Sequence, residues 1–227
     1  QDLAAKIPLT LELAILALIV AIVVAVPLGV LSAVMQDTPV DYVARIVAIG
    51  GVALPTFWVG ILVIYFLVLL FDWLPPFGYV QLWEDPVKNL QQLIFPALAL
   101  GFYNMALIAR STRSALLEEF REDYIRTARS KGLREELVII RHALKNAFLP
   151  VLTLAGWQFG MLLAGTVVIE KIFVLPGTGR LLIDSIFHRD FATIQATVMV
   201  ITVMVLGLNL VIDLLYGWLD PRIRYKQ

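Results

Sequence analysis

The sequence predicts an all-α integral membrane protein, and three observations support this. Hydrophobic residues make up 60% of the 227 residues and charged residues only 16%, whereas soluble domains are about one-quarter charged. Five uncharged runs are each long enough for a helix to cross the hydrocarbon core, which takes roughly 20 apolar residues. Lysine and arginine collect between alternate runs. These features exclude an ordinary soluble globule.

The five runs should all form helices, because lipid offers no hydrogen-bond partner to an unpaired backbone group. Pro27, Pro55, Pro96 and Pro150 predict kinks or helix boundaries. We expect one transmembrane domain over residues 1–227. The uncharged runs are Leu13–Met35, Ile46–Phe71, Leu90–Ala109, Ala147–Ile169 and Phe191–Ile212, within spans predicted over about 9–35, 46–71, 90–109, 147–169 and 191–217.

The distribution of basic residues predicts the orientation of these spans. Most of the 18 lysines and arginines lie near Arg45, in the stretch 110–146, and in the tail after Gly217. The positive-inside rule places these segments, and the C-terminus, in the cytoplasm. Five spans then put the N-terminus outside. Because the chain opens Gln1-Asp2-Leu3 with no secretory signal, we expect at least one transmembrane helix upstream.

The residue counts also exclude several kinds of functional site. The chain has no cysteine, which excludes a disulfide framework, a thiol nucleophile and cysteine metal ligands. Only two histidines are present, so the sequence predicts no metal site. The formal net charge is zero, and nothing in the charge balance points to a nucleic-acid partner.

The stretch 110–146 differs from the rest of the chain because it is strongly charged. Its first half carries an apolar residue every four positions (Leu116, Phe120, Tyr124, Ala128), and its second half carries a similar series (Leu133, Leu137, Ile140, Leu144). Each series predicts one face of a helix. Gly132 lies between them and predicts a stop or tight turn. An ordinary amphipathic loop in the membrane interface would have the same pattern. A DNA-binding helix-turn-helix is disfavoured, because both arms continue into spans.

Two parts of this stretch resemble the EAA loop of binding-protein-dependent ABC importer permeases. They are Tyr124-Ile-Arg-Thr-Ala-Arg-Ser-Lys-Gly132 and Arg141-His-Ala-Leu-Lys-Asn-Ala-Phe-Leu-Pro150. Ala128 and Gly132 hold the second alanine and the glycine of that pattern. Arg126 stands at its acidic position, Thr127 at its first alanine, and Lys145 where a proline is common. At these positions the sequence resembles the version of the loop found in the dipeptide/oligopeptide permease branch.

Further motifs extend the resemblance over nearly the whole chain. A match to a single short motif is weak evidence, but these motifs occur in the family's order and at matching topological positions. The resemblance implies the core of a type I ABC importer permease, MetI-like, normally preceded by one more span and an extracytoplasmic segment. The motifs are Thr10–Ala14, Leu54–Trp58, Ile169–Phe173 with Leu175–Arg180, Asp213–Tyr216 and Asp220–Arg224.

The resemblance implies a channel-forming subunit that works with partners. The sequence contains no G-x-x-x-x-G-K-[ST] loop, so ATP and Mg are expected on two separate ATP-binding subunits and no cofactor on this chain. The other implied partners are a second permease, usually a different chain, an extracytoplasmic substrate-binding protein, and the lipid bilayer. The implied location is the cytoplasmic membrane of a bacterium or archaeon. The residues expected to couple to the ATPase are Tyr124, Thr127, Ala128, Arg129, Lys131, Gly132 and Leu133.

Two smaller sets of residues are candidates for transport roles. The stretch 170–190 contains Pro176-Gly-Thr-Gly179, a turn in which two glycines can take unusual dihedral angles. We interpret it as an outer hairpin near the gate, formed by Glu170, Pro176, Gly177 and Gly179, although a simple surface turn remains an alternative. Polar residues inside spans usually face the bundle or a water path. The candidates for the translocation path are Gln158, Asn209 and Asp213.

The sequence therefore predicts a non-enzymatic channel subunit of an ATP-driven importer of peptides or similar small solutes. The main alternative is a stand-alone secondary transporter or channel, which would need internal repeats or deep carboxylates that the sequence does not display. An intramembrane enzyme is a third class, but G-x-S-x-G and H-E-x-x-H motifs are absent. The motifs do not separate dipeptides from oligopeptides, nickel chelates, glutathione, opines or sugars.

Overall fold

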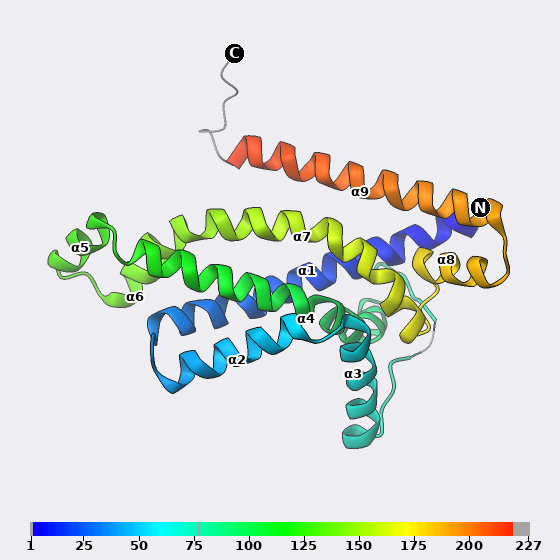
Figure 1. The fold of residues 1–227 in the computed structure, drawn as a ribbon, viewed down its shortest axis with the longest axis horizontal. Coiled ribbons are helices and arrows are strands. Elements are labelled where there is room, and N and C mark those ends of the chain that lie inside the picture. The colour runs from blue at the N-terminus through cyan, green and yellow to red at the C-terminus, as the bar shows by residue number, and fades with distance from the viewer. Residues whose placement is uncertain (1, 77, 220–227) are drawn as a thin grey trace, which may run out of the picture. The chain divides into compact units, whose positions relative to one another are not determined.

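The computed structural model describes residues 2–76 and 78–219, without the side chains of 2, 212, 213 and 215–219, and all its regular elements there are helical (Figure 1). The prediction of an all-α protein is confirmed. The helices are α1 (Asp2–Val34), α2 (Pro39–Ala53), α3 (Thr56–Phe71), α4 (Pro86–Glu119), α5 (Asp123–Ser130), α6 (Glu135–Leu137), the π-helical turn η1 (Val138–Ala143), α7 (Leu144–Ile172), α8 (Thr178–Phe187) and α9 (Phe191–Leu219).

Among the described residues, four helical segments are long and apolar enough to cross a membrane, and α2 with α3 is a fifth if the broken pair is counted as one span. The run predicted as one helix over 46–71 is therefore two helices. Leu54 is extended (φ −85°, ψ 128°), because a residue before proline is sterically kept from the helical region. Pro27, Pro96 and Pro150 lie inside α1, α4 and α7 without ending them.

The chain divides into two compact units. The first unit contains Gln1–Ile19, Pro55–Gly101 and Gly156–Gln227, and the second contains Val20–Leu54 and Phe102–Ala155. The break between α2 and α3 therefore falls at a boundary between units. Each unit is described separately below.

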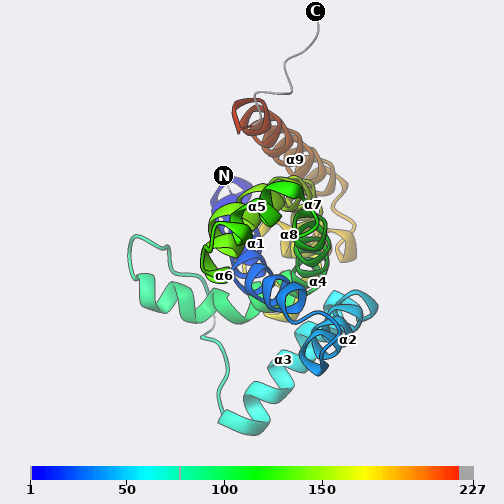
Figure 2. The same cartoon turned by 90° about the vertical axis from the view of Figure 1, so that its left-hand side faces the viewer.

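The second unit is packed through small residues. Added Cβ atoms show how close its helices lie: one at Gly29 of α1 would be 2.6 Å from the carbonyl oxygen of Ala109, and one at Gly51 of α2 would be 2.6 Å from the Cβ of Ala106. Figure 2 looks onto the end of this unit at which α5 and α6 lie. Five alanines and three larger residues form the core there: Ala33, Ala115, Leu116, Ile125, Ala128, Val138, Ala143 and Ala147.

In the first unit, hydrogen bonds tie the segment between α3 and α4 to the helices. The Tyr79 hydroxyl donates to Glu12 of α1 at 2.6 Å. The amide of Asn89 donates to the carbonyl of Val80, whose own N–H donates to Gln92 at 2.9 Å. Burial, followed by the bond to Glu12, raises the pKa of Tyr79. These bonds hold a proline-rich connection that has no regular structure of its own.

Candidate functional site

The stretch 110–146 forms a helical knob on the second unit, but its first helix is interrupted. The pattern at positions 116–128 predicts one continuous helical face, whereas α4 ends at Glu119 and α5 begins at Asp123. Leu116 and Ala128 face the core, while Tyr124 is exposed. The prediction was wrong because the chain turns at residues 120–122, so a spacing of four across that turn does not keep the side chains on one face.

The second predicted series does not form one side of a single helix, because Leu133 precedes α6 and only Leu144 packs against the core. Leu133, Leu137 and Ile140 are exposed, whereas Val138 and Ala143 are buried. Ile140 lies in η1, and a π-helical turn has wider spacing than an α-helix, which shifts the inward-facing positions to Val138 and Ala143. Leu133, Leu137 and Ile140 therefore lie on the surface of the knob.

Arg129 fastens the turn between α5 and α6. Its guanidinium binds the carboxylate of Glu135, with 2.6 Å from Nη2 to Oε1 and 3.2 Å from Nε to each oxygen, and it lies 5.7 Å from the ring centroid of Phe120. The hydrogen bonds to Glu135 raise the pKa of Arg129. Arg129 is one of the residues expected to couple to the ATPase, and the structure pairs it with an acid of its own chain.

Tyr124 joins α5 to the two long helices of the knob. Its hydroxyl donates to Glu119 at the end of α4 and accepts from Nδ2 of Asn146 on α7 at 2.9 Å. Burial and the bond to Glu119 raise the pKa of Tyr124. This contact ties α5 to α4 and α7.

The remaining coupling candidates divide into exposed and buried residues. Ala128, expected to couple to the ATPase, is only 7% exposed and belongs to the core of the knob. Gly132 adopts φ +74°, and a Cβ there would meet nothing within 4 Å, so a left-handed turn and not crowding favours glycine. Thr127, Lys131 and Leu133 are exposed around it.

In the first unit, Glu170 is completely buried beneath the loop that leads into α8. Thr10 of α1 donates to its Oε1 at 2.7 Å, and the backbone N–H of Arg180 donates to its Oε2 at 3.0 Å. The Thr178 N–H donates in turn to the Thr10 hydroxyl at 3.0 Å. Because buried carboxylates need such donors, Glu170 fastens the loop and the start of α8 to α1 and α7.

The glycines of this loop are needed for space and not for unusual dihedral angles. Gly177 has φ −93°, and Gly179 lies inside α8, so the predicted conformational freedom was wrong. A Cβ at Gly177 would lie 2.3 Å from the Glu170 carboxylate, and one at Gly179 would lie 2.4 Å from the Cα of Val167. In the loop between α7 and α8, the residue with positive φ is Val174 (58°). Pro176 precedes Gly177 and is half-buried.

We expect Gly177→Ala to lower the free energy of unfolding by about 1–3 kcal/mol, the range for overpacking. Its methyl group would collide with a carboxylate that Thr10 and Arg180 hold in place. The matched control is Gly207→Ala in α9, where a Cβ meets nothing within 4 Å and helix propensity favours alanine. Thermal unfolding in detergent tests this, and equal stability of the two variants would contradict it.

The translocation candidates lie in different surroundings. Gln158 on α7 is 2% exposed, and its Nε2 has no hydrogen-bond partner among the described residues. Asn209 on α9 is exposed, and its Oδ1 would be 3.3 Å from a Cβ at Gly160. The side chain of Asp213 lies outside the described residues. The role of these three residues in transport therefore stays a prediction. Among the described residues, no group of three or more His, Asp or Glu could hold a metal ion.

Sequence reasoning missed a buried ion cluster around Asp41. Arg113 of α4 binds both carboxylate oxygens, Nε at 2.8 Å and Nη2 at 2.9 Å, and Arg45 binds the same carboxylate. The Ser32 hydroxyl donates at 2.5 Å and the Asp37 N–H at 3.0 Å. Asp41 is fully buried. The only sequence signal was the i,i+4 spacing of Asp41 and Arg45.

Curated relatives match almost the whole chain. A putative peptide transport system permease protein of Brucella abortus (strain 2308) is 41% identical over 99% of this chain and 72% of its own length. The dipeptide transport system permease protein DppB of Escherichia coli (strain K12) is 39% identical over 100% of this chain and 74% of its own length.

Solved structures share the fold. The MetNI methionine ABC transporter matches with a TM-score of 0.75 at 15% identity, over 96% of each chain. An amino acid ABC transporter matches with a TM-score of 0.64 at 19% identity, covering 94% of this chain and 92% of that one. The MetI-like fold predicted from the motifs is therefore confirmed. The family described as "Binding-protein-dependent transport system inner membrane component" matches residues 25–225, and this chain belongs to that family.

Proposed function

We propose that this chain is the channel-forming subunit of an ATP-driven importer of peptides, driven through the knob at 110–146. Membership of a family of inner-membrane transport components carries the proposal. The substrate class rests on the printed names of relatives that are about 40% identical, which are peptide and dipeptide permeases. The chain is a transport subunit and not an enzyme, with ATP and Mg bound by its partners.

The geometry of the knob supports a coupling role. The buried residues Ile125 and Ala128 pack α5 onto a core shared with α4 and α7. Around the turn, Leu133 and Leu137 expose 40% and 47% of their surfaces, and Lys131 has no ion pair among the described residues. Apolar side chains beside an unpaired cation suit a groove with acidic edges on a partner. We therefore place the ATPase contact at Thr127, Lys131, Gly132, Leu133 and Leu137.

Arg129 and Tyr124 act differently in this proposal. Because both bind residues of their own chain, they keep α5 rigid instead of contacting the ATPase. A rigid α5 can bias a two-state equilibrium of the membrane helices, since movement of the partner reaches α4 and α7 without being lost in a flexible loop.

The proposed complex contains two ATP-binding subunits and a second permease, with an extracytoplasmic binding protein that supplies the peptide. Purification from the native membrane in a mild detergent, followed by mass spectrometry, tests this composition. We expect ATP-binding subunits and a second permease to accompany the chain. Recovery of the intact chain alone, or as a homo-oligomer that still transports, would instead favour a secondary transporter.

A further inference from the structure

Helix α2, in the second unit, is held by very few buried residues. Of its 15 residues, all of which the structure describes, the two that are buried are Asp41 and Gly51. A cavity of about 590 Å³ lies beside this helix and is lined by residues of α1, α2 and α4. On α2 itself, Val43, Ile46 and Ile49 are exposed. The attachment of α2 therefore depends on its two ends, where Asp41 and Gly51 lie.

The two attachments of α2 differ in kind. At Gly51 the contact is apolar, because a Cβ there would lie 2.6 Å from the Cβ of Ala106 on α4. At Asp41 the contact is an ion pair with Arg113 of α4, whose Nε and Nη2 donate to the two carboxylate oxygens at 2.8 and 2.9 Å. A bidentate pair fixes the orientation of its two groups as well as their distance. Asp41 and Arg113 therefore hold α2 and α4 in one relative position at this end of α2.

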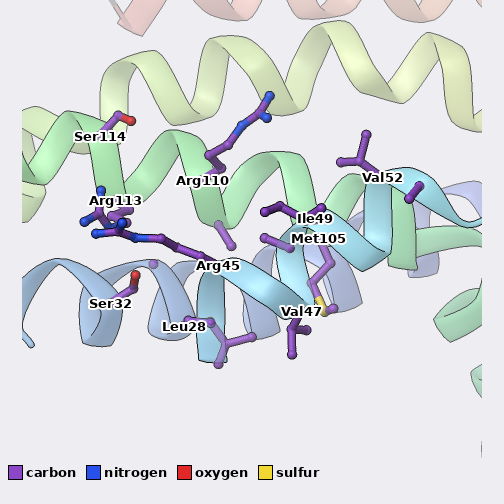
Figure 3. A pocket seen from close by; sticks show the side chains of 16 residues that line it. Leu28, Ser32, Arg45, Val47, Ile49, Val52, Met105, Arg110, Arg113 and Ser114 are labelled. Atoms are coloured by element: carbon purple, nitrogen blue, oxygen red, sulfur yellow. The ribbon is translucent and has the colours of Figure 1, made fainter. Parts of the chain in front are cut away.

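The ion cluster adjoins the core of the knob on two helices. On α4, Arg113 lies two residues before Ala115, and on α1, Ser32 directly precedes Ala33. Both alanines belong to that core. Figure 3 shows Ser32 and Arg113 together with Arg45 of α2 at one end of the cavity. Because a packed core does not deform continuously, a displacement of the knob moves the cluster with it.

We propose that Asp41 and Arg113 are positioning residues of the transport cycle, through which movement of the knob is passed to α2. This inference rests on the proposed function, since it takes the knob as the part that an ATPase moves. Without the ion pair, the knob would still bind its partner, but α2 would be left with Gly51 as its buried contact with α4 and would not follow. Arg45 acts differently, because it lies on α2 one turn after Asp41 and so does not join α2 to another helix.

The test uses the complete importer with its binding protein, reconstituted in lipid vesicles and supplied with a mixture of radiolabelled short peptides. The readout is the number of peptides imported per ATP hydrolysed. Arg113→Met removes the guanidinium but keeps a long unbranched side chain, whereas Arg45→Gln removes the other cation from the same carboxylate. We expect Arg113→Met to keep hydrolysing ATP and to lower this ratio about tenfold, within the range of coupling between sites. Arg45→Gln should keep the ratio of the unaltered importer, and Arg113→Lys, which retains the cation, should recover most of it.

A double variant separates coupling from folding. Removing one member of a buried ion pair leaves an uncompensated charge, whereas removing both does not. Asp41→Asn/Arg113→Met should therefore unfold at a temperature closer to that of the unaltered protein than Asp41→Asn does. Its number of peptides per ATP should nevertheless stay as low as that of Arg113→Met. A pair that served stability alone would regain both properties, and that result would contradict the proposal.

Two further results would overturn the proposal. One is that Arg113→Met, in an importer that elutes normally, imports as many peptides per ATP as the unaltered importer. The other is that Arg45→Gln lowers the ratio as far as Arg113→Met, because the charge balance at Asp41 and not the link to α4 would then be responsible. Both results leave the proposed function standing, since the unaltered importer still couples ATP hydrolysis to uptake. Absence of ATP-driven uptake in the unaltered importer would instead contradict the proposed function, and this inference with it.

Discussion

Gly132→Asp should reduce peptide uptake to background while leaving membrane insertion intact. Gly132 stands at φ +74° in the turn after α5, where a side chain costs about 1–3 kcal/mol of backbone strain. A Cβ there meets no atom of this chain within 4 Å, so the added carboxylate would project toward the partner. It would also place a negative charge beside Lys131, in the surface proposed to meet acidic groups. Uptake in cells, normalised to the amount of inserted chain, measures the effect.

Gly78→Asp is the matched control for this experiment. Gly78 has φ +90° and likewise has open space around its Cβ position, so the substitution imposes similar backbone strain. Gly78 lies in the segment between α3 and α4 and is not part of the knob, so uptake should remain close to normal. Equal loss of uptake in both variants would show that strain, and not docking at residue 132, is responsible.

Asp41→Asn should lower the free energy of unfolding by about 3 kcal/mol. Removing one member of a buried ion pair leaves an uncompensated charge and costs about 3–5 kcal/mol. The lower end applies because Arg45 is partly exposed to solvent. The same substitution at Asp37 is the control, since Asp37 is 65% exposed and lies 3.4 Å from Arg45. It should cost at most about 1 kcal/mol.

Thermal unfolding of the two purified variants in detergent distinguishes these outcomes. Because both substitutions replace a carboxylate by an amide of the same shape, the comparison isolates the buried charge. If Asp41→Asn were no less stable than Asp37→Asn, the cluster would contribute specificity of packing and not stability.

The sequence predicted the helical spans and the turn at Gly132 because these depend on local composition. A run of apolar residues has only one stable conformation in lipid, and glycine is favoured wherever φ is positive. The break at Leu54–Pro55 was also predictable, since proline restricts the residue before it.

Local patterns failed where distant residues decide the structure. Ser32, Asp41 and Arg113 form one cluster although 72 residues separate Asp41 from Arg113, and no spacing rule relates them. The π-helical turn η1 leaves Ile140 exposed and turns Val138 and Ala143 into the core of the knob, which an α-helical spacing does not predict. Gly177 resembled a turn glycine, but a buried carboxylate 160 residues from its partner Thr10 determines that position.

Site-specific cross-linking tests the central claim, that the knob receives movement from an ATPase. The chain has no cysteine, so Lys131→Cys introduces a unique thiol on the exposed side of the turn. A thiol-reactive photocross-linker at this position should capture an ATP-binding subunit in native membranes. Asp85→Cys, in the exposed segment before α4, should not. Capture of the ATP-binding subunit from residue 85 but not from residue 131, in a complex that still transports, would contradict the account.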